Sequence, residues 1–476
     1  TSGSQNIAIG SYTGINITSG GENVLIGKST GNAFNSNQVT AVGTLACASI
    51  TSSNGDGTVA VGYKSLTSLT SGAGNTALGG LSGQYNETGD QNTYVGYASG
   101  LGASGNSHST NTAVGYFTLK DITTGGANTV IGAFAGDVVT SQDSLTLVGK
   151  SAGGAINNNG ANGTTAVGAT SFELLTSGAE NTAVGYGTAA QTTTGGGNTV
   201  LGYQALTGDV DGDGADNTVL GHKAMLAAVS PSKNVAIGDS AMRAMNGTAN
   251  GIAQCVAIGS NAFYGDATNT TTATDGTTAI GYNSLFALTT GAQNTAIGSY
   301  NSDALTTGGY NTSVGRSTLS ALTTGSHNIA LGRATLTTAA DDESDNIAIG
   351  NSSLGAAKQD GTASSTNREI KRNVAIGTDA LAGGTLTGTN HLESNIAIGY
   401  QAMDATGANN QIGTIAIGTS TLGALTSGSG NTAVGYLSAD AVTTGNHNTA
   451  IGYEALSTAT VTAGQDEHTA VGYQAL

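Results

Sequence analysis

A five-residue unit, Asn-x-Ala-x-Gly, recurs from end to end of this chain and limits its fold more than any other feature. Aligned on its glycine, here called the anchor, the unit occurs 26 times. The anchors stand at positions 10, 27, 43, 62, 79, 96, 115, 132, 149, 168, 185, 202, 221, 238, 259, 281, 298, 315, 332, 350, 377, 399, 418, 435, 452 and 472. The residue before the anchor is Val, Ile or Leu in all 26 copies, and the third residue before it is Thr, Val or Ile in all 26. Ala stands between them in 19 copies, and Asn precedes all three in 18.

This alternation has a period of two, and β-branched residues occupy every second position, which is typical of a strand with one buried face. A helix is excluded because the 3.6-residue period is absent and because Gly, Thr, Val and Asn are weak helix formers. Short strands recurring at the commonest spacing of 17 residues indicate a solenoid, in which each coil packs on the next. The predicted fold is an all-β, parallel β-solenoid of about 26 coils: an elongated, flattened β-roll with a 17-residue basic repeat and two short strands per coil.

The repeat fills residues 1–476, and we therefore expect one solenoid domain. Residues 43–238 are regular, because their anchor spacings repeat as blocks of three coils and 53 residues. Residues 239–476 are looser and carry longer insertions. The longest of these, 356–372, contains four of the 13 Lys and Arg residues. Solenoids place such insertions on loops of one face.

We expect the residues one and three before the anchor to point inward, because they are aliphatic or β-branched. Ala and the anchor Gly then form a smooth outward stripe, bordered by a residue that is Tyr in ten copies. This assignment predicts that Ile297→Asp destabilises the fold. It also predicts that Ala183→Arg and Ala296→Arg disrupt assembly of chains, whereas the same change at the loop residue Thr362 does not.

The net charge of −17 excludes a basic patch able to neutralise a nucleic-acid backbone. No apolar run reaches the ~18 residues of a membrane span, and no signal-peptide pattern opens the chain. The chain starts and stops inside the repeat without an initial Met, and we expect it to be part of a longer protein.

One acidic segment resembles the start of a calcium-binding loop. Asp209, Asp211 and Asp213 stand at alternate positions and a glycine follows them, as such loops require. The acid expected at the twelfth position is replaced by Leu220, although Asp216 offers a further oxygen. The sequence leaves two interpretations open, a calcium site and a solvated acidic turn, and predicts no other cofactor.

The other potentially reactive side chains have structural interpretations. The acids at 341, 342, 343 and 345 could supply the paired carboxylates of a glycosidase, but no His or Arg cluster accompanies them and an acidic surface loop is the favoured interpretation. The histidines are scattered, without metal-ligand spacing, at 108, 222, 327, 391, 447 and 468. Cys47 and Cys255 are twelve coils apart, too far for a disulfide within one chain. They are either small ladder residues or partners of the equivalent cysteines in neighbouring subunits.

Residues 234–238 and 373–377 read Asn-Val-Ala-Ile-Gly, and residues 6–10, 346–350 and 395–399 read Asn-Ile-Ala-Ile-Gly. These units resemble the head repeat of trimeric autotransporter adhesins, which form homotrimeric parallel β-rolls. The longer form at 281–294 is similar to repeats of phage tail fibres and large bacterial surface proteins. The resemblance covers the whole chain, but the adhesin repeat is shorter, at about 14 residues.

The resemblance implies a non-enzymatic extracellular fibre, either an adhesin or a tail-fibre shaft, located on a cell surface or virion. Its expected partners are other copies of itself, in a homotrimer or an end-to-end filament, together with a cell-surface glycan or protein receptor. Two alternatives stay open, a polysaccharide-cleaving solenoid and an ice-binding solenoid. An outward array of threonines would support ice binding, whereas the facing expected above turns them inward.

Overall fold

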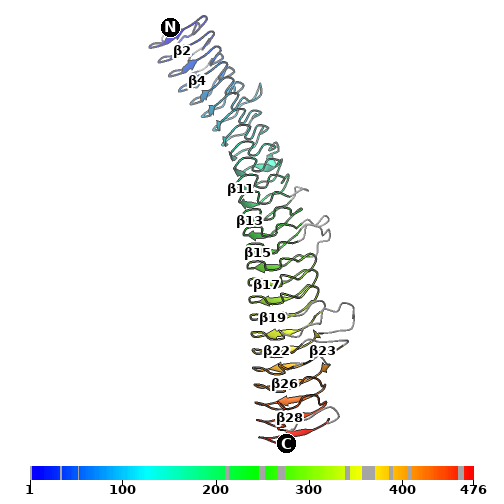
Figure 1. Ribbon diagram of the computed structural model, residues 1–476. Helices are drawn as coiled ribbons and strands as arrows, with labels where there is room; N and C mark the ends of the chain where they lie inside the picture. Colours follow the sequence, from blue (N-terminus) through cyan, green and yellow to red (C-terminus); the bar gives the residue numbers. More distant parts are fainter. Residues whose placement is uncertain are drawn as a thin grey trace. The chain divides into compact units, whose positions relative to one another are not determined.

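A computed structural model describes residues 3–476 except 33–34, 52, 209–213, 246–251, 266–273, 338–342, 356–369, 385–389, 406, 408–409 and 459–465. The chain forms two compact units, unit 1 (Thr1–Lys233) and unit 2 (Asn234–Leu476). Each unit is an elongated stack of coils, and its strands lie one after another along one side of the stack (Figure 1). The parallel β-solenoid predicted from the repeat is therefore confirmed.

Each described coil contributes a three-residue strand that ends directly before its anchor. Unit 1 contains β1 (Ile7–Ile9), β2 (Val24–Ile26), β3 (Thr40–Val42), β4 (Val59–Val61), β5 (Thr76–Leu78), β6 (Thr93–Val95), β7 (Thr112–Val114), β8 (Thr129–Ile131), β9 (Thr146–Val148), β10 (Thr165–Val167), β11 (Thr182–Val184), β12 (Thr199–Leu201) and β13 (Thr218–Leu220). Unit 2 contains β14 (Val235–Ile237), β15 (Val256–Ile258), β16 (Thr278–Ile280), β17 (Thr295–Ile297), β18 (Thr312–Val314), β19 (Ile329–Leu331), β20 (Ile347–Ile349), β22 (Val374–Ile376), β24 (Ile396–Ile398), β26 (Ile415–Ile417), β27 (Thr432–Val434), β28 (Thr449–Ile451) and β29 (Thr469–Val471).

Within each unit, successive strands pair in parallel and in register, so equivalent positions of neighbouring coils lie side by side. The expected second strand of each coil is absent from most described coils. The segment after the anchor is a series of turns that still hydrogen-bond from coil to coil, as where the Leu66 amide donates to Ser82 O at 3.0 Å. Unit 2 adds one small parallel sheet of β21 (Ile370–Lys371), β23 (Leu392–Glu393) and β25 (Gln411–Ile412). Helical structure in the described residues is limited to two short 3-10 turns, η1 (Ser53–Gly55) and η2 (Asn159–Ala161).

The side-chain facing expected from the sequence is wrong. In the coil around β7, the middle strand residue Ala113 is fully buried, and so is Asn111 on the same side of the strand. Thr112 and Val114 point to the other side and are partly exposed. The same pattern, buried in the middle and exposed on both sides, recurs along both units. We call the middle residues the inner column, and the residues one and three before the anchor the outer columns.

The opposite wall of the coil explains this reversal. Leu119 and Ile122, four and seven residues after the anchor, fill the interior from that wall and are fully buried. The coil is too thin to take a second large aliphatic side chain from the strand, because protein interiors are packed at nearly crystalline density. Alanine is the size that fits against the leucines.

Two large residues of the inner column are accommodated by glycines on the opposite wall. Tyr94 and Leu147, which are 53 residues apart, replace alanine in the inner column and are fully buried. A Cβ on Gly83 or Gly100 would lie against the Tyr94 ring, and one on Gly153 would lie 2.9 Å from Leu147. These two large inner residues thus lie where the opposite wall has glycine instead of leucine, whereas the smaller Val200 and Val219 are buried opposite Leu206 and Met225.

The anchor itself is fixed by the spacing of the coils. Gly298 has a φ of +138°, which L-residues with a side chain rarely adopt. A Cβ at this position would also overlap the carbonyl oxygen of Gly315, the next anchor. The anchor glycines therefore do not form part of a smooth outward stripe. They permit the coils to stack at β-sheet spacing.

Candidate interaction surface

The outer columns form the most regular exposed surface of each unit. In unit 1, the column three before the anchor is a run of threonines that pair in register from coil to coil. This run comprises Thr76, Thr93, Thr112, Thr129, Thr146, Thr165, Thr182, Thr199 and Thr218. Val, Leu or Ile fills the second outer column beside each of them. The surface of unit 1 therefore alternates hydroxyl-bearing and aliphatic columns.

Five neighbouring strands of unit 2 differ, because both of their outer columns are aliphatic. We call this surface the isoleucine patch. It consists of Ile329, Leu331, Ile347, Ile349, Val374, Ile376, Ile396, Ile398, Ile415 and Ile417. All ten side chains are partly exposed, with Ile329 at 40% and Ile417 at 38%. Threonine returns to the outer column on both flanks, at β18 and β27.

The tyrosines that follow several anchors form a third column. Tyr436 and Tyr453 stack with their ring centroids 5.2 Å apart, and Tyr453 stacks on Tyr473 at 5.3 Å. The interplanar angles of 18° and 11° mean that the rings cover one another's faces and leave their edges to solvent. Such stacking stabilises neighbouring coils, whereas a sugar-binding platform requires a ring face that stays open.

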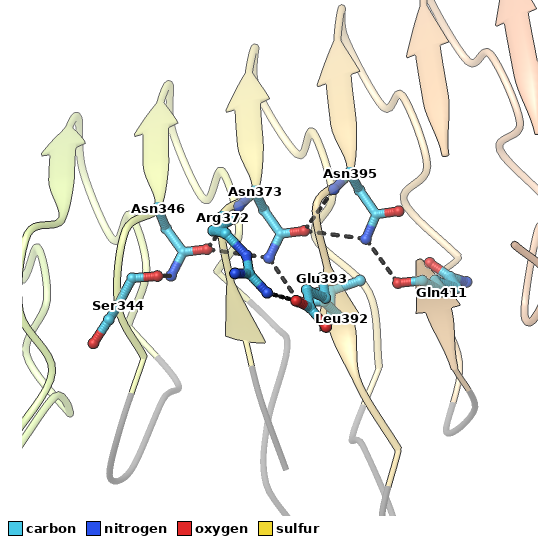
Figure 2. A network of polar contacts seen from close by, with 8 residues as sticks. All are labelled: Ser344, Asn346, Arg372, Asn373, Leu392, Glu393, Asn395 and Gln411. Atoms are coloured by element: carbon cyan, nitrogen blue, oxygen red, sulfur yellow. Dashed lines mark hydrogen bonds and ion pairs between the residues drawn. The ribbon is translucent and has the colours of Figure 1, made fainter. Parts of the chain in front are cut away.

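Buried asparagines connect the coils inside the strand side. The Asn373 side-chain amide donates to Asn346 Oδ1 at 3.1 Å and to Leu392 O at 2.7 Å (Figure 2). Asn373 Oδ1 accepts from the backbone amide of Asn395 at 3.1 Å and from its side-chain amide at 3.0 Å. Beside this ladder, Arg372 forms an ion pair with Glu393. The asparagines are buried and hydrogen-bond neighbouring coils to one another, so they are not a binding site.

The sequence had a signal for this ladder. Asn stands two residues before the inner Ala, on the same side of the strand, in 18 copies. An amide side chain repeated at β-sheet spacing can donate and accept along the whole stack. Asn and Ala should therefore have been assigned together to the interior.

The predicted calcium site is not tested, because Asp209, Asp211 and Asp213 lie outside the described residues. Asp216 is described and exposed, and its backbone amide donates to Gly196 O at 3.0 Å. Among the residues that the structure describes, no group of three or more His, Cys, Asp or Glu side chains could hold a metal ion.

The acidic loop is only partly described. Its residues 341 and 342 lie outside the described part, and so does the loop residue Thr362. Glu343 is fully buried and Asp345 is exposed, so these two carboxylates are in different environments. The pairing of these acids for glycoside cleavage is therefore not tested.

Three isolated reactive groups lie inside the coils. His108 is buried, its Nδ1 lies 2.6 Å from the Tyr94 hydroxyl, and burial lowers the pKa of the imidazole to about 4. Cys47 and Cys255 are buried and form no disulfide. Burial raises the pKa of the Cys47 thiol to about 12 and that of Cys255 to about 11, so both thiols stay protonated at neutral pH. This burial favours the packing interpretation of the cysteines over a bond between subunits.

No family model, curated protein or solved structure matches this chain. In the described part of the chain, no helix is long and apolar enough to cross a membrane.

Proposed function

We propose that this chain is a non-enzymatic structural segment of an extracellular fibre, of the surface-adhesin or tail-fibre kind, and that its copies associate side by side into a homotrimer. The observation that supports the proposal is the pair of outer columns, which present partly exposed aliphatic side chains in coil after coil. A contiguous exposed apolar surface marks an interaction site. Because the surface repeats in each coil, copies aligned in register can bury it coil against coil.

The coil architecture suits a shaft that carries load. Each coil contacts only its neighbours, through a parallel strand ladder, turn hydrogen bonds and the asparagine ladder. In this proposal the shaft holds a glycan- or protein-binding region away from a cell or virion surface. The chain's resemblance to adhesin heads and tail fibres is the reason for choosing this location.

Native mass spectrometry of the full chain tests the assembly. We expect three times the chain mass of 46.3 kDa. Electron microscopy of the same sample distinguishes the alternative of end-to-end filaments, which would lengthen with protein concentration while keeping the width of one chain. A uniform population of single chains would contradict both forms of assembly.

Ice binding is a second candidate, because the structure reverses the argument against it. The nine threonines of unit 1 point outward, in register and beside an aliphatic column. A flat array of hydroxyl and methyl groups at strand spacing, ~4.8 Å, can hold ordered water. A thermal-hysteresis assay on the full chain decides: hysteresis that Thr146→Lys abolishes would support this candidate, and its absence in the parent would exclude it.

A further inference from the structure

We propose that the isoleucine patch is the surface through which copies of this chain associate, patch against patch, with their solenoid axes parallel. This inference rests on the proposed lateral association and names its site. The patch lies entirely within unit 2, on strands β19, β20, β22, β24 and β26.

The isoleucine patch is the longest run of strands with two aliphatic outer columns; shorter runs occur at β1 and β2, at β4, and at β14 and β15. Its five strands carry ten Ile, Val or Leu residues outward and no polar residue. The strands on each flank, β18 and β27, have threonine in one outer column, as β5 to β13 do in unit 1. Water hydrogen-bonds the threonine hydroxyls of those strands. Removing the purely aliphatic isoleucine patch from water is therefore more favourable in free energy.

The size of the patch suits the centre of a longer interface. Five strands at ~4.8 Å spacing cover roughly 20 Å along the stack. A stable interface buries about 800 Å² on each partner, more than this patch can supply alone. The outer columns of the flanking coils of unit 2 continue in register with the patch and can supply the rim of the interface.

Charges at the two edges of the patch specify how the copies face. Arg333 directly follows an anchor, and Asp345 lies five residues before the next one, so they stand at opposite ends of neighbouring strands. Both side chains are exposed. Copies related by a rotation axis parallel to the solenoid bring opposite edges together, and Arg333 of one copy then meets Asp345 of the next. An antiparallel arrangement brings like edges together. The edge that carries Asp345 also carries Arg372, five residues before the next anchor, but Arg372 is already paired with Glu393. Charge complementarity therefore favours the parallel assembly.

Sedimentation velocity on the full chain tests the site. We expect Ile347→Lys with Ile396→Lys to raise the concentration for half-assembly at least about 100-fold, because each lysine would be buried without a partner. The matched control places lysines at the same strand position in unit 1, as Thr146→Lys with Thr182→Lys, and should change it less than about 5-fold. Circular dichroism of each variant checks that the solenoid remains folded.

A charge exchange tests the orientation. Arg333→Asp or Asp345→Arg alone should weaken assembly about 10-fold, and the two together should restore it to within about 3-fold of the parent. Failure of the double variant to recover would refute the parallel facing. An assembled parent that is insensitive to the patch lysines but dissociated by the unit 1 lysines would overturn the patch while leaving the fibre proposal intact. A monomeric parent would overturn both.

Discussion

Replacing one asparagine of the buried ladder should destabilise several coils at once. Asn373→Ala removes four side-chain hydrogen bonds, two donated by Asn373 and two accepted by it (Figure 2). Asn346 Oδ1 keeps its bond from the residue 373 backbone amide, at 3.1 Å. The Leu392 carbonyl and the Asn395 amide each lose a partner in the interior.

The magnitude follows from those two groups. A buried polar group that loses its partner costs about 1–3 kcal/mol, so we expect a loss of about 2–6 kcal/mol. The control is Asn351→Ala, an exposed asparagine one coil away, which should change stability by less than about 0.5 kcal/mol. Both variants should be made in the full chain.

Hydrogen exchange is the appropriate assay, because long repeat arrays need not unfold in one cooperative step. We expect faster exchange in Asn373→Ala at the amides of β20, β22 and β24, the strands that this part of the ladder connects. Amides of unit 1 should keep their parent rates. Exchange in Asn373→Ala that matches Asn351→Ala at all three strands would refute a stabilising role for the ladder.

Three further predictions follow from the core and from one carboxylate. Gly298→Ala should lower the free energy of unfolding by more than about 3 kcal/mol, measured by thermal or denaturant unfolding. The added Cβ would overlap the backbone of the next coil, and the φ of +138° is unfavourable for alanine; unchanged stability would refute the close approach. Ala296→Arg should prevent folding, because its side chain would enter the interior, whereas Ile297→Asp, on the outer column, should leave the solenoid folded. Circular dichroism distinguishes the two results, and the reverse outcome would support the facing expected from the sequence. Burial raises the pKa of Asp440 and so penalises its carboxylate in the folded state. Asp440→Asn should therefore raise the melting temperature at pH 7, and this advantage should disappear below the ordinary aspartate pKa of about 3.9, where the acid is protonated in both the folded and the unfolded chain. An equal effect at both pH values would show that desolvation is not the cause.

The alternating pattern of the strands does not fix which of their faces is buried. A period of two divides strand residues into two sets but does not state which set is inside. Residue hydrophobicity favoured Val114 over Ala113, yet the structure buries Ala113 and leaves Val114 partly exposed. The decision depends on Leu119 and Ile122, which reach the same interior from the other side of the coil.

The candidate surface was only partly predictable for the same reason. The tyrosine column after the anchor was expected at the border of an exposed stripe, and its members are indeed exposed, as Tyr436 is at 46%. The isoleucine patch was not expected, because its residues were assigned to the core. Once the facing is known, the patch can be read from the repeat as the longest stretch without threonine in the outer columns.

The sequence by itself determined the parallel solenoid, the coil count and the register of the strands, because a strict local repeat admits only neighbours of the same kind. The volume of the coil interior was decided by the tertiary structure. That volume favours alanine in the strand and admits residues as large as Tyr94 and Leu147 where Gly83, Gly100 and Gly153 make room. The packing of the strand against the opposite wall of the coil decides which side chains are exposed. The surface available for association therefore depends on both walls together and not on any single segment of the repeat.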